Sequence, residues 1–498
     1  METSVHLDLV RRLEQFRQYL PAGIAVYLVG GAVRNALLGL AVHDLDFVVE
    51  QDALLVARRL ADALQGAYYT LDLERDTGRV ILSDSHGRRL ALDFAGMRGP
   101  DLESDLRARD FTINAIAINP HQPERMIDPL GGAADLHARV LRACSPQAFE
   151  SDPVRILRAV RFASTYELKI LPDTLRWLRA AIPRLGRVSA ERLRDELFRM
   201  LESRHPAACL RVLHRLGVLQ QFLPELSRLS GVRQPLPHVY DVWEHTLAVV
   251  QQLQVLFSVL DVRYQPDVSA NLMTGLLALR LGRYRQQLDE HLRAALNRDR
   301  SMKALISLAA LYHDAGKPDA QRVDPSGEIH FFHHEQVSAE LVRWRAAELR
   351  LSNDEIERVA TIVRHHMRPL WLADGDELPS RRAIYRFFRQ TGAAGVDICL
   401  LSLADVLATH GATLTQERWQ RHLDVARLLL EAWWEHPTET VSPPPLLSGR
   451  ELMAHFDLQP GPQIGSILEA VREAQAAGQV NTLEQALELA RSLLKQDK

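Results

Sequence analysis

Two aspartates separated by one residue, Asp44 and Asp46, carry the strongest chemical signal in the sequence. In a β-strand, residues i and i+2 point to the same face, so both carboxylates would project side by side. Carboxylates placed in this way hold Mg²⁺ between a protein and the phosphates of its substrate. Asp93, at the end of the apolar run LALDF, is a candidate third carboxylate, although a turn-capping aspartate explains it equally well.

The segment before these carboxylates has the features of a phosphate-binding turn. The apolar, β-branched run from Ile24 to Val29 predicts a strand that leads into Gly30–Gly31. Adjacent glycines let the backbone approach a ligand closely. Residues 32–38, which include Arg34, then have helical spacing. The G-x-x-x-x-G-K-[ST] motif is absent, which excludes a P-loop triphosphatase.

Two later segments contain arginines that are candidates for nucleotide binding. Arg109 lies in RARDFTINAIAI, where it binds a ribose or triphosphate or pairs with a neighbouring aspartate. In FESDPVRILRAVRFA, Asp152 is expected to cap a helix whose one side carries Arg155, Arg158 and Arg161. A guanidinium offers two parallel donors to a base edge, and a carboxylate beside it accepts from a base amino group. Asp152 with Arg155 is therefore a candidate for nucleotide selection by side chains, and a helix cap with a solvated basic face is the alternative.

The region behind this helix is basic although the whole chain is nearly neutral. Residues 154–215 contain 14 Lys or Arg against 6 Asp or Glu, a local net charge of +8, while the net charge of the chain is −3. Such a patch fits a groove that binds a nucleic-acid backbone. Aromatic residues are sparse in it, so we expect recognition of a structured RNA by shape and phosphates.

A different chemistry follows residues 227–237, a Gly/Pro/Ser-containing segment where we expect a domain boundary. Imidazole and carboxylate groups recur there on several expected helices, and they suit one or two divalent ions inside a helical bundle. The candidate ligands are His245, His313, Asp314, His334, His365 and Asp405. In the pairs 333–334 and 365–366 we prefer His334 and His365, a choice that spacing alone does not fix. A single such histidine is more often structural, but the whole set favours a metal site.

Length and composition set the remaining limits. A chain of 498 residues with 47% hydrophobic and 25% charged residues is expected to form several globular domains. Its three cysteines are far apart and form no C-x-x-C motif, which predicts neither a disulfide framework nor a zinc knuckle. We find neither a signal peptide nor an uninterrupted apolar run long enough to span a membrane. We therefore expect a cytoplasmic protein with no membrane partner.

Taken together, LVGGAVRNALLG with DLD, RDFTINAIAI and DPVRILRAVRF resemble the class II tRNA nucleotidyltransferase and poly(A) polymerase family over roughly residues 20–220. The later histidines resemble the HD phosphohydrolase domain, which is fused to bacterial members. The resemblance implies an α+β fold, with a small mixed-sheet nucleotidyltransferase palm followed by all-helical neck, HD and tail domains. We place these parts at residues 1–140, 141–228, 229–430 with an insertion near 257–300, and 431–498.

The resemblance also implies roles by position. Asp44 and Asp46 would hold the catalytic Mg²⁺ ions, Gly31 and Arg34 would contact the triphosphate, and Arg109 would lie near the sugar of the nucleotide. Asp152 and Arg155 would pair with the base of CTP or ATP, supported by Arg158 and Arg161. The 3′-hydroxyl of tRNA would attack the α-phosphorus and release pyrophosphate. The HD site would hold a second divalent metal such as Mg, Mn or Ni, and a homodimer is possible.

Two residues depart from the family pattern, and the sequence allows other functions besides CCA addition. Asn35 stands where the family usually has Asp, and Ser151 stands where many members have an acidic residue. Both concern nucleotide choice, since members that add CCA, only CC, only A or a poly(A) tail share these motifs. A second hypothesis makes the HD domain the main activity, a metal-dependent phosphohydrolase with an RNA-binding front half. A third is a non-enzymatic RNA-binding scaffold.

Overall fold

The computed structural model describes residues 2–21, 23–42, 44–83, 89–263, 271–297 and 300–496. The chain divides into two compact units, which are described separately. Unit 1 comprises residues 1–196 and 216–221, and unit 2 comprises residues 197–215 and 222–498. Unit 1 contains a mixed sheet and unit 2 is almost entirely helical, so the predicted α+β class is confirmed.

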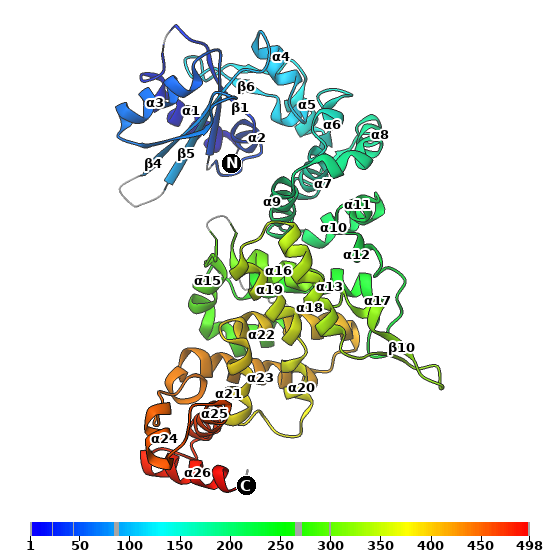
Figure 1. Ribbon diagram of the computed structural model, residues 1–498. Coiled ribbons are helices and arrows are strands. Elements are labelled where there is room, and N and C mark those ends of the chain that lie inside the picture. The colour runs from blue at the N-terminus through cyan, green and yellow to red at the C-terminus, as the bar shows by residue number, and fades with distance from the viewer. Residues whose placement is uncertain are drawn as a thin grey trace. The chain divides into compact units, whose positions relative to one another are not determined.

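Unit 1 is built on a seven-stranded sheet with the order β3-β4-β5-β2-β1-β6-β7 (Figure 1). Its strands are β1 (Val26–Val29), β2 (Asp44–Val49), β3 (Ala67–Asp72), β4 (Thr77–Ser83), β5 (Arg89–Gly96), β6 (Ala117–Ile118) and β7 (Met126–Ile127). The central pair β2 and β5 is parallel, and the other neighbours are antiparallel. The strands expected from the apolar runs are all present, with ends that differ by a few residues.

The two faces of this sheet differ. Alternation along β2 turns Leu45 and Phe47 into the main core, where Phe47 stacks on Phe94 of β5 with ring centroids 4.8 Å apart. Helices α1 (Glu2–Arg17), α2 (Gly31–Leu37) and α3 (Ala53–Leu64) pack on this face and complete the core together with residues of the other strands. The same alternation turns Asp44 and Asp46 to the opposite face. A smaller cluster that includes Val29 and Ala117 packs on this second face over β1 and β6.

Short helices continue unit 1 after the sheet. They are α4 (Leu102–Arg107), η1 (Thr112–Asn114), α5 (Gly132–His137), α6 (Ala148–Ser151), α7 (Arg155–Thr165), α8 (Pro172–Ala181), η2 (Ile182–Arg187), α9 (Ala190–Leu201) and α11 (Val218–Phe222), with the strand pair β8 (Val140–Leu141) and β9 (Lys169–Ile170) between them. The predicted cap at Asp152 is wrong. Helix α7 begins at Arg155 after Val154, whereas Asp152 follows the end of α6 in an extended conformation. Pro153 separates the two helices, because a proline cannot continue the preceding helix.

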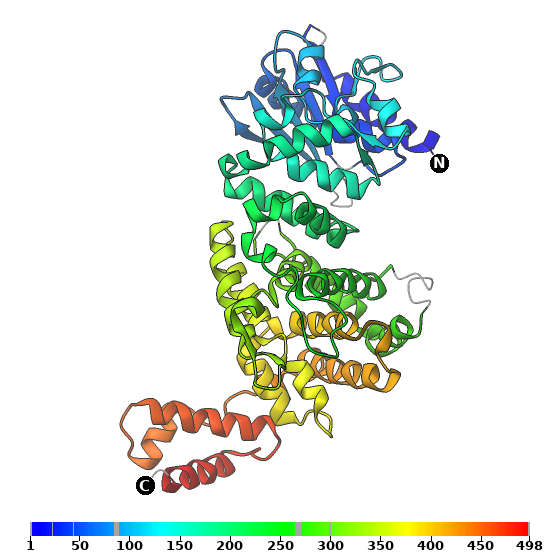
Figure 2. The ribbon, with the colours of Figure 1, turned by 90° about the vertical axis from the view of Figure 1, so that its right-hand side faces the viewer.

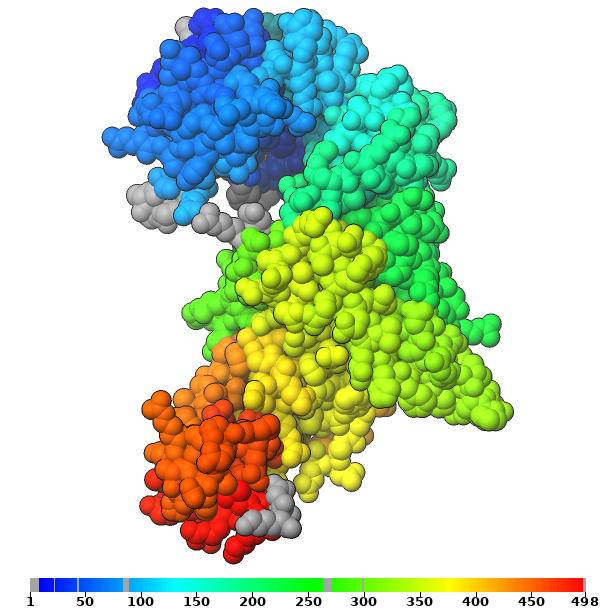
Figure 3. Space-filling model, in the orientation of Figure 1, coloured from blue at the N-terminus to red at the C-terminus, as the bar shows by residue number. Residues whose placement is uncertain are grey.

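Unit 2 contains a helical bundle and a C-terminal group of three helices. The bundle elements are α10 (Pro206–Arg215), α12 (Pro224–Ser227), α13 (Val242–Val259), α14 (Leu272–Leu281), η4 (Gly282–Tyr284), α15 (Arg285–Arg293), α16 (Met302–Tyr312), α17 (Lys317–Ala320), α18 (His334–Glu348), α19 (Asn353–His365), α20 (Arg368–Asp374), α21 (Arg381–Thr391), α22 (Ala394–His410), η5 (Gly411–Thr413), α23 (Gln416–Trp434) and η6 (Pro437–Val441). A hairpin of β10 (Gln321–Val323) and β11 (Ile329–Phe331) projects from the bundle (Figure 3). Helices α24 (Gly449–Phe456), α25 (Pro462–Ala476) and α26 (Leu483–Gln496) enclose an apolar cluster of their own and form a distinct group at the end of unit 2 (Figure 2).

One segment of unit 2, Ala394–Thr413, is long and apolar enough to cross a membrane by composition. Of its most apolar window, 89% is buried inside the protein. It contains α22, which packs against α13, α19 and α23. An apolar helix enclosed by other helices is typical of a protein core.

Candidate nucleotidyl-transfer and metal sites

The outward face of the sheet in unit 1 brings three carboxylates together. Asp46 on β2 lies opposite Asp93 on β5, and Asp44 lies two residues before Asp46 on the same face. Neighbouring strands are about 4.8 Å apart, so this pairing puts two like charges side by side. The surrounding protein and the carboxylate of Asp93 raise the pKa of Asp46 to about 6. A cluster of carboxylates with this repulsion fits a divalent cation, which would neutralise it.

Asp93 already has a partner within the protein. Its two carboxylate oxygens accept hydrogen bonds from Nε and Nη2 of Arg79, at 2.7 and 2.8 Å. Arg79 lies directly opposite Asp93 on the neighbouring strand β4. The pair therefore fixes the orientation of Asp93 towards Asp46 and balances part of the negative charge of the face.

The turn after β1 approaches the carboxylates closely. Gly30 has φ +76° and ψ −132°, a backbone conformation that favours glycine. A Cβ atom at this position would lie 3.5 Å from Nη1 of Arg109 and 3.6 Å from Oδ2 of Asp46. The structure thus brings Gly30, Arg109 and Asp46 to one place. Gly31, the predicted triphosphate contact, begins α2 directly after this turn.

Arg34 is held rigidly on α2. It is 7% exposed, and its Nη1 donates to Oδ1 of Asn114 at 2.5 Å. Its Nε and Nη2 donate to Oδ1 of Asn35 at 3.2 and 2.9 Å. The guanidinium also lies 4.6 Å from the ring centroid of Tyr166. Asn35, the departure from the family pattern, thus binds Arg34 as a neutral acceptor.

Arg109 pairs with an aspartate that the sequence did not single out. Its Nε donates to Oδ2 of Asp105 at 3.0 Å, and the other oxygen of Asp105 accepts from the backbone N–H of Arg98 at 3.0 Å. Asp105 is 1% exposed. Because Asp105 is buried and fully engaged, it sets the direction of Arg109 towards Gly30.

The arginine side of α7 has acidic partners. The local sequence predicted a basic face without them. Arg158 binds the buried Asp110, with Nε and Nη2 at 2.9 and 2.7 Å from Oδ2. Arg161 donates through Nε to Glu196 of α9 at 2.8 Å. Burial by itself would raise the pKa of Asp110, but the charge of Arg158 and hydrogen bonds from Asn114 and Arg158 lower it. The prediction missed these partners because they lie tens of residues away in the chain.

Arg155 also makes contacts within the protein. It is 8% exposed and donates to three backbone carbonyls, those of Ala108 at 2.9 Å and of Arg109 and Ala148 at 3.2 Å. Its Nε lies 4.0 Å from Oδ2 of Asp152. Arg155 therefore clamps the loop that carries Arg109 to α6 and α7.

Asp152 makes its shorter ion pair with an arginine of α9. Arg192 Nη2 lies 2.6 Å from Oδ2 of Asp152. The other carboxylate oxygen, Oδ1, is buried and has no hydrogen-bond partner among the described residues. A buried acceptor of this kind is costly unless a ligand or water satisfies it. Sequence reasoning missed Arg192, although its place in the basic region 154–215 was a signal.

A pocket of about 860 Å³ contains this aspartate. It lies within unit 1 and is lined by Glu74, Arg75, Asp76, Thr77, Ala95, Gly96, Met97, Arg98, Ala108, Ser145, Gln147, Ser151, Asp152, Arg155 and Arg192. Ala95 follows Asp93 by two residues on β5, so the pocket begins about 6.7 Å from the carboxylate row. The hydroxyl of Ser151 donates to the carbonyl of Ala148 at 3.1 Å.

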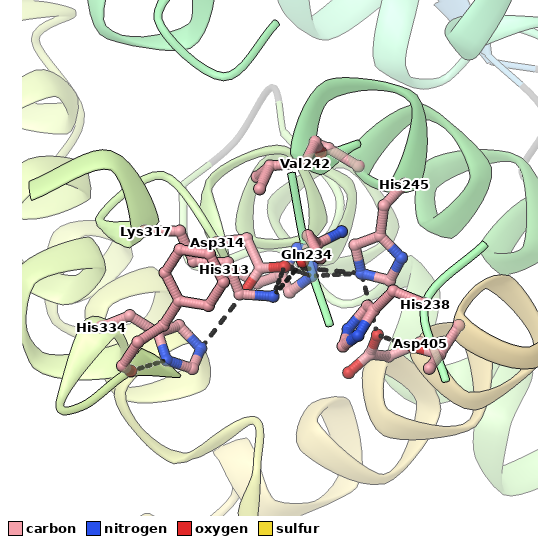
Figure 4. A network of polar contacts seen from close by, with 12 residues as sticks. Gln234, His238, Val242, His245, His313, Asp314, Lys317, His334 and Asp405 are labelled. Carbon is pink, nitrogen blue, oxygen red and sulfur yellow. Dashed lines mark hydrogen bonds and ion pairs between the residues drawn. The ribbon is translucent and has the colours of Figure 1, made fainter. Parts of the chain in front are cut away.

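In unit 2 a buried cluster of histidines and aspartates lies between α13, α16, α18, α19 and α22. Nε2 of His245 is 3.3 Å from Nε2 of His313 and 3.1 Å from Oδ1 of Asp405 (Figure 4). Asp314 lies between the rings, with His313 Nε2 3.2 Å from its Oδ2 and His334 Nε2 3.2 Å from its Oδ1. The structure thus brings together five of the six predicted ligands.

The sixth ligand requires a correction. The predicted His365 is half-buried, whereas its neighbour His366 is fully buried and groups with Asp314 and His334. Consecutive residues of a helix point about 100° apart, so one member of the pair faces the cluster and the other turns away. His366, not His365, is the histidine of this pair that belongs to the cluster.

The histidines of this cluster are oriented by backbone carbonyls. Nδ1 of His313, His334 and His366 lies 2.8, 2.9 and 2.7 Å from the carbonyl oxygen three residues earlier. A proton on Nδ1 leaves Nε2 as the free lone pair, which is the usual arrangement for a metal-binding histidine. Nε2 of His366 is buried without a hydrogen-bond partner among the described residues. This donor set of nitrogen and oxygen atoms fits one or two divalent transition ions.

Burial and the two carboxylates Asp314 and Asp405 have the largest influence on the pKa values in the cluster. Burial lowers the pKa of His366 to about 3, with a further contribution from His313 and His334. Although burial alone would raise the pKa of Asp314, the charges of His313 and Lys317 hold it well below its usual range. Lys317 Nζ lies 2.7 Å from Oδ2 of Asp314. Asp314 is therefore ionised and the His366 ring is neutral, the states in which these two groups bind a metal.

A cavity of about 350 Å³ opens beside the cluster. Asp314, His334 and Asp405 line one part of it, and Phe331, Met367, Leu370 and Trp371 form an apolar wall. Arg418, His410 and His422 line it as well. The cavity accommodates a small molecule next to the candidate metal ligands.

Comparisons with known proteins match the segments that contain both candidate sites. Profiles described as "Poly A polymerase head domain", "Probable RNA and SrmB- binding site of polymerase A" and "HD domain" match residues 26–142, 167–229 and 242–409. The chain is 34% identical to an "A-adding tRNA nucleotidyltransferase" of Deinococcus radiodurans, with 94% of each chain covered. It is 33% identical to a "CC-adding tRNA nucleotidyltransferase" of Thermus thermophilus, with 92% of this chain and 91% of the relative covered. A solved structure, "The complex structure of CCA-adding enzyme with ATP", has the same fold, with a TM-score of 0.59 and 23% identity over 98% of this chain and 95% of that chain.

Proposed function

The chain belongs to the tRNA nucleotidyltransferase and poly(A) polymerase family, and we propose that it transfers CMP and AMP from CTP and ATP to the 3′ end of tRNA. It is a nucleotidyltransferase with an attached HD domain. The observation that carries the proposal is the set of three carboxylates Asp44, Asp46 and Asp93 beside the pocket that contains Asp152. Asp93 is two residues from Ala95 on β5, and Ala95 lines that pocket. Transfer and base selection thus share one face of unit 1.

In this proposal each group of side chains has a separate task. Asp44 and Asp46 are the ligands of Mg²⁺, and Asp93, oriented by Arg79, completes the carboxylate row. The bound ions supply activation of the 3′-hydroxyl and charge neutralisation at the departing pyrophosphate. Gly31 and Arg34 bind the triphosphate, since the glycine turn permits close approach and Arg34 is already held by Asn114 and Asn35.

Base selection is assigned to the pocket. Asp152 presents a buried oxygen that lacks a partner, which suits the amino group of cytosine or adenine. Arg109 lies next to Gly30 and is the group for the sugar. Arg155, Arg158 and Arg161 build the frame of the pocket through their carbonyl and carboxylate contacts. For Arg155, direct contact with the base requires that it release at least one carbonyl.

The partner is proposed to be the 3′ end of tRNA. The basic segment 154–215 supplies an electrostatic surface for phosphates, and the two relatives described above, which match along nearly the whole chain, are named tRNA nucleotidyltransferases. We keep the four-part division predicted from the sequence, the homodimer and the cytoplasmic location as parts of this proposal.

The product is the point that most needs an experiment. The full-length relatives are named A-adding and CC-adding, so CC-only and A-only products are the alternatives to CCA. We would incubate the full chain and Mg²⁺ with three tRNAs that end before the first C, before the second C and before A. Extension of all three by CTP and ATP supports CCA addition, and extension of a subset assigns CC or A addition. If none is extended, the proposal fails.

A second activity is proposed for unit 2. The buried cluster opens into a cavity of about 350 Å³ with Lys317 and Arg418 in its lining, so a small phosphate ester fits beside a metal ion such as Mg, Mn or Ni. We propose that the HD site hydrolyses such esters. Release of phosphate from a small phosphate ester by the metal-loaded full chain tests it, with Asp314→Ala as the inactive variant.

A further inference from the structure

The catalytic face of unit 1 extends beyond the carboxylates to the edge of the sheet. One row of directly opposite residues crosses four strands, from Asp46 on β2 through Asp93 on β5 and Arg79 on β4 to Tyr69 on β3. Directly opposite residues point to the same face of a sheet. Tyr69 therefore shares a face with the carboxylates, and three strand spacings place its backbone about 14 Å from that of Asp46.

Both residues at the far end of this row are accessible. The ring of Tyr69 is 53% exposed, and the side chain of Arg79 is 41% exposed although two of its nitrogens bind Asp93. The adjacent row on the same face runs from Asp44 through Ala91 and Ile81 to Ala67, so the residues of this row next to the tyrosine are apolar. An exposed aromatic ring beside a guanidinium is the combination that stacks with unpaired bases.

The direction of the reaction indicates which substrate would lie there. In phosphoryl transfer the attacking and leaving oxygens are roughly in line with the phosphorus. The triphosphate-binding turn, Gly30 and Gly31, lies on the β1 side of the carboxylates. The attacking 3′-hydroxyl must then arrive from the opposite side, over β5. The RNA that carries this hydroxyl consequently leaves across β4 and β3, towards Tyr69.

We propose that Tyr69, with Arg79 beside it, is the stacking platform for an unpaired base near the 3′ end of the RNA primer. This inference rests on the proposed nucleotidyl transfer and adds a subsite to it. Tyr69 is a positioning residue, because it holds the primer so that its hydroxyl faces the α-phosphorus. Its ligand is a single-stranded nucleotide of any sequence, since every base offers a face for stacking.

The experiment compares Tyr69→Ala with Tyr19→Ala in the full chain. Tyr19 is a second tyrosine of unit 1, 38% exposed, and belongs to the segment after α1. For tRNA that lacks its last nucleotides, Tyr69→Ala is expected to raise the Kd, measured without nucleotide, and the KM about tenfold, the loss of one base–aromatic stack. The KM for CTP or ATP should stay unchanged. Tyr69→Phe should behave as the unmodified protein, because the ring is kept.

A second arm locates the base. Abasic tRNAs, each lacking the base at one of the last three positions, are bound to the unmodified protein and to Tyr69→Ala. At the position that stacks on Tyr69, the abasic substitution weakens binding to the unmodified protein and leaves binding to Tyr69→Ala unaltered. Equal weakening of both proteins at all three positions overturns the inference.

Failures of the two proposals are distinguishable. If the unmodified protein extends no RNA, the proposed function fails. If it extends RNA and Tyr69→Ala matches Tyr19→Ala, only the platform is wrong. A raised KM for the nucleotide with an unchanged Kd for tRNA also contradicts it, since the ring would then contact the incoming base. A changed oligomeric state with unchanged tRNA affinity assigns the face to a second copy and likewise overturns it.

Discussion

In unit 1 the carboxylates Asp44 and Asp46 stand on the outward face of a sheet, beside a pocket of about 860 Å³. In unit 2 the histidines and aspartates are buried among helices, beside a cavity of about 350 Å³. The outward face leaves room for a polymer end and a nucleotide together, whereas the buried cluster admits a small ligand only. Both sites fit divalent ions, and they differ in the size of the ligand that can reach them.

The two sites also differ in how their groups are oriented. In unit 2 three histidines of the cluster, His313, His334 and His366, are each aligned by the carbonyl three residues earlier in the chain. In unit 1 two arginines of α7 are aligned by partners from distant segments, Arg158 by Asp110 and Arg161 by Glu196. Local alignment sets the ring orientation of these three histidines without a partner from another helix. Distant alignment couples the nucleotide pocket to the packing of several helices.

The largest expected effect separates the two activities. Asp46→Asn removes a ligand charge from the carboxylate row, and we expect it to lower nucleotide addition at least 10³-fold, about 4 kcal/mol. Hydrolysis by the HD site should be unchanged. Asp62→Asn, at a carboxylate of α3 that is 72% exposed, is the control and should leave both activities intact. Comparable rates for Asp46→Asn and Asp62→Asn would show that the transfer site lies elsewhere.

The next effect tests the correction within the histidine pair. His366→Ala should weaken divalent-metal binding about 10- to 100-fold and reduce phosphate release, because it removes a ligand. His365→Ala should do neither, since this side chain turns away from the cluster. Metal content by mass spectrometry and the metal-dependent rise in melting temperature measure the difference. His366→Gln serves as a second variant that keeps most of the side-chain volume. Loss of metal in His365→Ala would reverse the assignment.

A third test asks which arginine of the pocket is structural. Arg155→Ala strips three carbonyls of their donor, and we expect a loss of at least about 2 kcal/mol in the stability of unit 1. For a unit of this size, that corresponds to a melting temperature about 5 °C lower. Arg192→Ala should leave the melting temperature unchanged and raise the KM for the nucleotide, because Arg192 is 54% exposed and pairs with Asp152. The reverse pattern would make Arg155 the reader of the base.

The smallest effect concerns the departure at position 35. Asn35→Ala removes an acceptor from Arg34, and we expect the KM for CTP or ATP to rise about fivefold, near 1 kcal/mol. Asn35→Asp restores the residue usual in the family and a charged acceptor, so the KM should stay within about twofold. Initial-rate kinetics on a tRNA with a single missing nucleotide measure both. A larger change in Asn35→Asp than in Asn35→Ala would contradict the role of Asn35 as a neutral holder of Arg34.

Local patterns were sufficient for much of this protein. Alternation along β2 determined that Asp44 and Asp46 share the outward face, and apolar runs determined the strands around them. The resemblance to the family followed from motifs that are each short and continuous in the sequence. The set of histidines in unit 2 was also visible in the sequence, because imidazole and carboxylate groups recur there on several expected helices.

Contacts between distant segments were decided only by the tertiary structure. Packing turns His366, and not His365, into the cluster, and it buries Asp152 beside Arg192 instead of at the start of a helix. It also provides the arginines of α7 with their acidic partners. Sequence spacing specifies which residues share a face of one element. Which faces meet depends on how the helices and the sheet pack, and side-chain geometry follows from that packing.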